Sequence, residues 1–144
     1  MIIAVVDGMG GSIGNQIVLG LRQALPEETE IMALGTNAIA TGNMMKAKAT
    51  RGATGENAIA FSIAEADIIM GSLSIVVPNS MMGEVTPRIA TALASAGGRK
   101  ILLPISNPPL EILGTSRKPL QNLIRDAIDL VREQYGLPAA TEEE

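Results

Sequence analysis

Cysteine and histidine are both absent from the 144 residues of this sequence. Without cysteine there are no disulfide bonds and no thiol chemistry. Without histidine the chain lacks the usual general base, the usual zinc ligand and the central residue of serine–histidine triads. An enzyme of this sequence would have to rely on carboxylates such as Asp7, Glu56 and Glu84 or on a lysine. We therefore assign no catalytic residue and no metal ligand.

Aromatic residues, basic stretches and long apolar runs are also scarce. Phe61 and Tyr135 are the only aromatic side chains that could stack on a base, and no basic stripe accompanies them. Binding to nucleic acid is therefore not expected. The apolar runs are too short to span a membrane, which takes about 20 residues. No basic leader precedes the first of them, so we expect a cytoplasmic protein.

The length predicts a single domain, because a chain of this size can bury about 68–70% of its unfolded surface around one core. We assign residues 1–137 to that domain and residues 138–144 to an acidic tail. The tail ends in Glu142, Glu143 and Glu144, which account for most of the net charge of −4. The domain itself is close to neutral.

Residues 2–17 contain the most informative pattern. An apolar run ends at Asp7, which predicts a buried strand, and the apolar residues from position 13 onward recur at helical spacing. A strand that passes through a glycine-rich turn into a helix is typical of phosphate-binding loops, because glycines let the backbone approach an anion and the helix N-terminus offers free N–H groups. We expect Gly10 or Gly11 to adopt a positive φ. The candidate cofactor-binding residues of this loop are Asp7, Gly8, Gly10, Gly11, Ser12, Ile13 and Gly14.

The loop matches neither of the two common nucleotide fingerprints. In the dinucleotide fingerprint the third glycine comes one residue earlier, where this chain has Ile13, and an acidic residue follows about 20 residues on. That region of the chain holds Gly35, Thr36 and Asn37 instead. The Walker pattern requires a lysine after the glycines, where this chain has Asn15. The alternative is that the glycines serve only the packing of the helix on the sheet.

Apolar runs and amphipathic segments alternate along the rest of the chain. The predicted strands are residues 2–6, 31–34, 67–70, 100–105 and 110–113, and the predicted helices are residues 12–25, 37–49, 56–65, one that starts at Thr86-Pro87 and one that starts at Pro119. We interpret residues 50–55 as a polar loop and residues 73–77 as a short strand or an irregular loop. Continuous apolar strands indicate a parallel sheet that is covered on both faces. The prediction is an α/β fold in three layers, with a doubly wound, mostly parallel five-stranded sheet of Rossmann-like order 3-2-1-4-5.

Small polar residues follow the predicted strands, where ligands bind in sheets of this kind. They are Asp7 and Gly8, Gly35 to Asn37, Gly71 and Ser72, Asn79 and Ser80, and Ser106 and Asn107. We expect Thr36 and Asn37 to contact the sugar of a nucleotide, and Asn79, Ser80 and Asn107 to contact the rest of the ligand. The alternative is that these residues only form turns and cap helices. For Asp7 three roles stay open: binding ribose hydroxyls, holding Mg²⁺, or bracing the loop by accepting backbone N–H bonds.

Four polar segments of the chain resemble one known family over nearly its full length. They are Asp-Gly-x-Gly-Gly-x-Ile-Gly at 7–14, Gly-Thr-Asn-Ala-Ile-Ala-Thr at 35–41, Gly-Ala-Thr-Gly-Glu-Asn-Ala at 52–58, and Asn-Ser-Met-x-Gly-Glu-x-Thr-Pro at 79–87. On these segments the chain is identified as a member of an uncharacterised bacterial family, domain of unknown function 3842. The resemblance implies a Rossmann-like domain without an assigned activity. The chain differs from the family pattern at Met9 and Asn15, so we expect no side-chain role for these two positions.

Three functions are consistent with these features. The first is binding of a nucleotide or another phosphorylated small molecule at the glycine-rich loop, with NADP or a similar nucleotide as the candidate cofactor. The second is a non-catalytic structural or regulatory dimer. The third is a stand-alone NADP-dependent reductase, in which Lys46, Lys48 and Arg51 would meet a 2′-phosphate. The Tyr-x-x-x-Lys pair of short-chain reductases is missing, because Ala139 stands four residues after Tyr135.

We expect the chain to form a homo-oligomer, most simply a two-fold dimer. A hydrophobic content of 47% with almost no aromatic residues, together with the doublets Met44-Met45 and Met81-Met82, indicates apolar surface that a partner subunit would cover. Light scattering at tens of micromolar should give a mass above that of one chain. A mass of 15.0 kDa would contradict the prediction.

Overall fold

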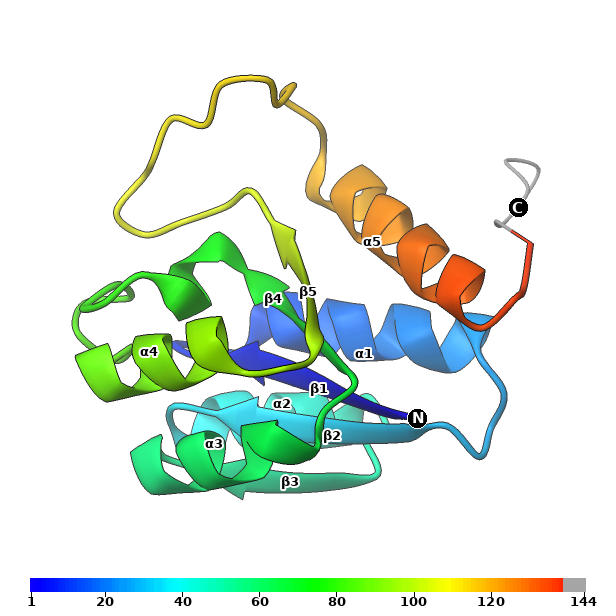
Figure 1. Cartoon of the computed structure of the whole chain (residues 1–144), viewed down its shortest axis with the longest axis horizontal. Coiled ribbons are helices and arrows are strands. Elements are labelled where there is room, and N and C mark those ends of the chain that lie inside the picture. Colours follow the sequence, from blue (N-terminus) through cyan, green and yellow to red (C-terminus); the bar gives the residue numbers. More distant parts are fainter. Residues whose placement is uncertain (139–144) are drawn as a thin grey trace.

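A parallel sheet of five strands forms the centre of the computed structural model, which describes residues 1–138 (Figure 1). Its strands are β1 (Ile2–Asp7), β2 (Glu30–Gly35), β3 (Arg51–Thr54), β4 (Ile68–Ser72) and β5 (Arg99–Leu103), in the order β3-β2-β1-β4-β5. Every pairing is parallel. The predicted fold class, strand number and strand order are confirmed. The predicted acidic tail lies, apart from Pro138, outside the described residues.

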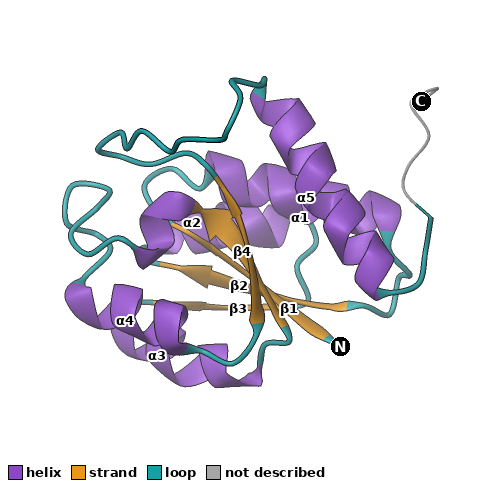
Figure 2. Cartoon of the chain, turned by 45° about the horizontal axis from the view of Figure 1, so that its top comes forward, coloured by secondary structure: helices purple, strands orange, loops and turns teal. Residues whose placement is uncertain are grey.

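Helices cover both faces of the sheet (Figure 2). One face carries α1 (Ser12–Ala24), α2 (Ala38–Lys46) and α5 (Leu120–Gln134), and the other carries α3 (Glu56–Ser62), α4 (Pro87–Ser95) and the 3₁₀ helices η1 (Ile63–Glu65) and η2 (Leu73–Val76). Each face of the sheet has its own hydrophobic core, and successive residues of β1 alternate between them. Val5 packs in one core and Val6 in the other. A strand that is buried on both faces has to be a continuous apolar run, which is why β1 could be predicted.

One strand position is filled by a segment for which we predicted a loop. Arg51–Thr54 forms the edge strand β3, which is mostly exposed and therefore carries no apolar run. It pairs in parallel with β2, and the Arg51 guanidinium lies 2.7 Å from a carboxylate oxygen of Glu30 and 2.8 Å from one of Glu65.

The predicted strand at residues 110–113 was wrong. This segment belongs to the long connection between β5 and α5, and Leu113 is 96% exposed. Pro108 and Pro109 immediately before it have no N–H groups for a sheet ladder. Residues 73–77, for which strand and loop were both open, form η2 instead. Helix α4 begins as predicted, with the Thr86 hydroxyl accepting the amide of Ile89 at 3.1 Å.

The connections after β1 and β4 run to opposite faces of the sheet. β1 continues into α1 on one face, whereas its neighbour β4 continues into η2 and α4 on the other. In doubly wound sheets, ligands bind beyond the carboxyl ends of the two strands at such a switch point. Among the described residues, no helix combines the length and the apolarity needed to cross a membrane.

The expected positive φ is confirmed at Gly11, where it is 75°. A Cβ at this position would also lie 2.7 Å from the Cα atom of Ala40, at the start of α2. Gly11→Ala should therefore lower the free energy of unfolding by more than ~1 kcal/mol. Gly10→Ala is the matched control, because a Cβ there meets nothing within 4 Å. Urea unfolding of both variants checks the prediction, and equal effects would contradict it.

Candidate functional site

The carboxyl end of β1 leads into a tight turn of residues 8–11. The amide of Gly11 donates to the carbonyl oxygen of Gly8 at 2.9 Å. Met9 has a φ of 50°, in the left-handed region, which costs a non-glycine residue ~1–3 kcal/mol. Helix α1 begins directly afterwards at Ser12. The turn thus places the N-terminus of α1 above the end of β1.

The Asp7 carboxylate ties this turn to the helix. One of its oxygens accepts the amide of Gly8 at 2.8 Å, and the other accepts the amide of Gly14 at 2.7 Å. Asp7 is only 4% exposed. Burial raises the pKa of its carboxyl above the usual value, the two amide bonds oppose this, and the charge of Glu84 adds to the rise. The contacts are those of the bracing role, and they occupy the amide of Gly14.

Two amides in the first turn of α1 stay open. The N–H groups of Ser12 and Ile13 have no hydrogen-bond acceptor within the part of the chain that the structure describes. Both residues line a cavity. Unpaired N–H groups at a helix N-terminus carry partial positive charge and favour a bound anion.

Glu84 joins the glycine-rich turn to the end of β2. Its Oε1 atom accepts three hydrogen bonds, from the Met9 amide at 2.8 Å, the Thr36 hydroxyl at 2.7 Å and the Asn37 side-chain amide at 2.9 Å. Partial burial would raise the pKa of Glu84, but these three donors outweigh it and hold the pKa below the usual value. Glu84 therefore carries its negative charge at neutral pH and fixes the turn in place.

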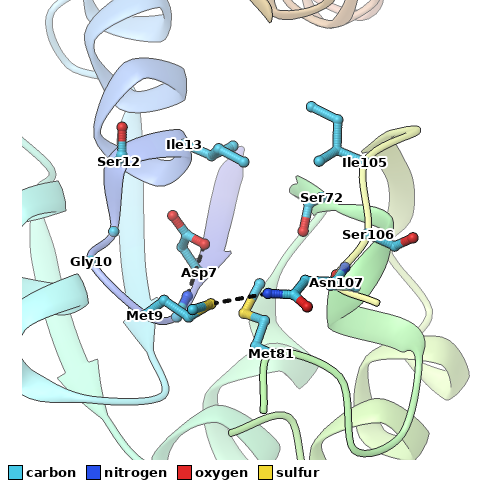
Figure 3. Close-up of a pocket in the computed structure, with 13 residues that line it drawn as sticks. Asp7, Met9, Gly10, Ser12, Ile13, Ser72, Met81, Ile105, Ser106 and Asn107 are labelled. Atoms are coloured by element: carbon cyan, nitrogen blue, oxygen red, sulfur yellow. Dashed lines mark hydrogen bonds between the residues drawn. The ribbon is translucent and has the colours of Figure 1, made fainter. Parts of the chain in front are cut away.

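A cavity of about 250 Å³ lies beyond the carboxyl ends of β1 and β4 (Figure 3). Its walls come from the turn after β1, the first turn of α1, the end of β4 with η2, Met81 and the segment after β5. The residues around it are Asp7, Gly8, Met9, Gly10, Gly11, Ser12, Ile13, Ser72, Ser74, Met81, Ile105, Ser106 and Asn107. This is the switch point of the sheet, where a ligand site is expected.

Ser72 is the buried polar side chain of this wall that is left unpaired. Its hydroxyl is the only buried side-chain polar atom of the described residues without a hydrogen-bond partner, and the residue is 2% exposed. The neighbouring Ser74 hydroxyl, by contrast, accepts the amide of Asn107 at 2.8 Å. In Figure 3 the Ser72 hydroxyl points into the space between Asp7 and Asn107.

Only part of the predicted site converges on the cavity. Seven of the candidate residues line it: Asp7, Gly8, Gly10, Gly11, Ser12, Ile13 and Asn107. Gly14, Thr36, Asn37, Asn79 and Ser80 do not. Asn37 caps α2 by accepting the amide of Ala40 at 2.9 Å, and the Ser80 hydroxyl donates to the carbonyl oxygen of Ser74. The hydrogen bonds of Asn37 and Ser80 are therefore those of the alternative interpretation, in which the polar residues cap helices and form turns.

Several lining residues had no assigned role. Ser72 and Ser106 stood in the expected polar set but were not assigned to a ligand, and Ser74 lay hidden in an apolar segment. Met9, where no side-chain role was expected, lines the cavity, and its Sδ atom accepts from the Asn107 side-chain amide at 3.7 Å. The amide of Met81 donates to the Asn107 carbonyl oxygen at 2.7 Å. That bond depends on tertiary structure, so no local pattern could have indicated it.

Comparisons with known proteins place the chain in a family but do not identify its ligand. The model of the family described as "Domain of unknown function (DUF3842)" matches residues 2–136. No curated protein matches the chain. A solved structure, a dodecameric FMN-dependent Ubix-like decarboxylase from Escherichia coli O157:H7, is similar with a TM-score of 0.48 and 12% identity over the whole of both chains. A likeness this distant assigns neither a ligand nor an assembly to the chain.

Asp7→Asn tests the cost of the buried carboxylate. The folded pKa of Asp7 lies above its unfolded value of 3.8, so folding favours the protonated form, and the stability from this group is lost as the pH rises through the folded pKa. Asparagine cannot ionise. The stability of the variant relative to the natural chain should therefore increase between about pH 3 and pH 7. Urea unfolding along this pH range checks it, and a constant or falling difference would contradict it.

Proposed function

The chain belongs to the family described as domain of unknown function DUF3842, and from its site we propose that it binds a nucleotide or another phosphorylated small molecule at the glycine-rich loop. The observation that carries this proposal is the pair of open amides at Ser12 and Ile13, at the N-terminus of a helix and in the wall of a cavity. A phosphate oxygen is the acceptor that such groups favour.

The unpaired Ser72 hydroxyl supports the proposal independently. A buried hydroxyl without a partner costs ~1–3 kcal/mol, and a ligand in the cavity would supply the missing hydrogen bond. Ser72 and the open amides lie on different elements, β4 and α1, which are brought together only by the sheet. A ligand that contacts both would therefore lie across the switch point.

The charge of the cavity limits the kind of phosphate group. Among the described residues that line it there is no lysine or arginine, and Asp7 is acidic. The phosphate would be held by neutral donors alone, as happens at helix N-termini. A group of low charge, such as a phosphodiester or a monoester, suits this environment better than a triphosphate, whose several charges need cations nearby.

Residues outside the cavity would support binding indirectly. Thr36 and Asn37 hold Glu84, which in turn holds the amide of Met9 in the glycine-rich turn. The backbone amide of Asn79 donates to the carbonyl oxygen of Val85. This bond closes the loop that contains Met81, which lines the cavity. In this proposal Thr36 and Asn37 position the glycine-rich turn instead of contacting the sugar of the nucleotide.

We propose only the chemical class of the ligand, a nucleotide or another phosphorylated small molecule, and NADP is one candidate. Tyr135 lies at the C-terminus of α5 and does not line the cavity beyond β1 and β4. Arg51 forms ion pairs with Glu30 and Glu65. Neither residue adds support to a reductase. We assign no catalytic residue.

Association into a homo-oligomer belongs to the same proposal. Phe61, Met82 and Leu113 expose 77%, 88% and 96% of their surface. Exposed apolar side chains of this size are suited to burial against a partner subunit.

Ser72→Ala separates a ligand contact from a structural one. Removing an unpaired buried hydroxyl should leave the unliganded protein as stable as the natural chain or more stable. It should weaken the binding of inorganic phosphate, AMP or NADP⁺ by about 2–10-fold, the value of one hydrogen bond. Calorimetric titration and urea unfolding measure the two effects.

Ser74→Ala is the matched control in the same wall. Its hydroxyl already accepts the Asn107 amide, so this variant should lose stability. Unchanged affinity in Ser72→Ala would contradict a role for that hydroxyl. Absence of binding heat for all three probes would contradict the proposed function and favour the structural dimer.

A further inference from the structure

A second cavity lies next to the proposed site. It measures about 590 Å³ and is enclosed by the connection of residues 104–119, between β5 and α5, and by Leu120 and Leu123 at the start of α5. In Figure 1 this connection arches away from the sheet before the chain enters α5. The cavity is thus formed by a segment to which no role has been assigned so far.

The two cavities share a wall. Ile105 and Ser106 line both of them. In Figure 3 the Ile105 side chain extends toward Ile13, whereas the Ser106 hydroxyl points away from Asp7. Adjacent residues of one short segment therefore border the two spaces, and a molecule that occupied both would have to pass this segment.

Size favours a molecule that occupies both spaces. Sites for small molecules measure about 300–1,000 Å³. The first cavity, at about 250 Å³, lies below this range, and the second, at about 590 Å³, lies within it. The open amides and the Ser72 hydroxyl are in the smaller space. A nucleotide anchored there has to extend beyond it.

The charges of the two cavities differ. The second contains Arg117, which has no ion pair or hydrogen bond among the described residues. Its neighbour Lys118 is paired with Asp126 at 2.8 Å. Glu111 also lines this cavity without forming an ion pair with Arg117. Arg117 is therefore a cation that is available to a bound anion.

We propose that the bound molecule is elongated and carries two separated anionic groups, one at the amides of Ser12 and Ile13 and the other at the Arg117 guanidinium. This inference rests on the proposed phosphate site. The chemical class is a nucleotide with a second phosphate apart from the first, as in a nucleoside 3′,5′-bisphosphate or a dinucleotide with a phosphorylated ribose. The uncharged middle of the molecule passes Ile105 and Ser106.

Matched pairs of probes test the second anion. AMP and adenosine 3′,5′-bisphosphate differ by one phosphate, and so do NAD⁺ and NADP⁺. In at least one pair, the more phosphorylated member should bind the natural chain about tenfold more tightly, as expected for a charge-assisted hydrogen bond. Arg117→Gln should abolish this difference and leave the affinity for inorganic phosphate unchanged. Arg125→Gln, on α5 and outside both cavities, removes the same charge and should preserve it.

Two-dimensional NMR separates this inference from the proposed function. Inorganic phosphate should shift the amide resonances of Ser12 and Ile13, and the more phosphorylated member of the discriminating pair should also shift the side-chain Nε resonance of Arg117. Shifts at Ser12 and Ile13 together with an Arg117→Gln variant that keeps the tenfold preference would overturn the inference alone. Absence of shifts at Ser12 and Ile13 with every probe would overturn the proposed function and the inference with it.

Discussion

The hydrogen bonds from Gly8 and Gly14 to the Asp7 carboxylate are the constraint on which the site depends. They join the last residue of β1 to the first turn of α1, so the glycine-rich turn between them has little freedom. The carboxylate satisfies one of the N–H groups that every helix N-terminus leaves open. When it is ionised, this carboxylate disfavours a highly charged ligand beside the open amides. One buried side chain thus sets both the geometry and the electrostatics of the cavity.

Glu84 extends this constraint to the rest of the carboxyl edge of the sheet. Three of the four segments that carry the family resemblance meet at its Oε1 atom: the turn at Met9, the end of β2 at Thr36 and Asn37, and the loop of Glu84 itself. That loop contains positive φ values at Asn79, Met81, Met82 and Gly83. Left-handed backbone in side-chain-bearing residues persists only where surrounding contacts hold it. The contacts among these segments therefore hold the carboxyl edge of the sheet together.

The sequence predicted the parts of the fold that depend on local pattern. Apolar runs identify β1, β2, β4 and β5, and Thr86-Pro87 identifies the start of α4. The edge strand β3 could not be identified in this way, because it is mostly exposed and carries no apolar run. Its pairing with β2 depends on tertiary structure. Of the predicted site residues, Asp7, Gly8, Gly10 to Ile13 and Asn107 line the cavity, whereas Gly14 does not. Thr36 and Asn37 were not distinguishable from ligand contacts, because their partner, Glu84, lies far along the chain.

Several features that cost folding free energy lie around one cavity. The left-handed Met9 and Met81, the unpaired Ser72 hydroxyl and the open amides of Ser12 and Ile13 all border the same cavity. Left-handed backbone also occurs outside the cavity, at Lys48, Asn79 and Met82. The rest of the domain shows alternate burial in β1 and capped starts of α2 and α4. If the glycine loop served only packing, nothing would favour keeping these costs together beyond the ends of β1 and β4. The proposed ligand would supply partners for the Ser72 hydroxyl and for the amides of Ser12 and Ile13, whereas the left-handed residues are held by the surrounding chain.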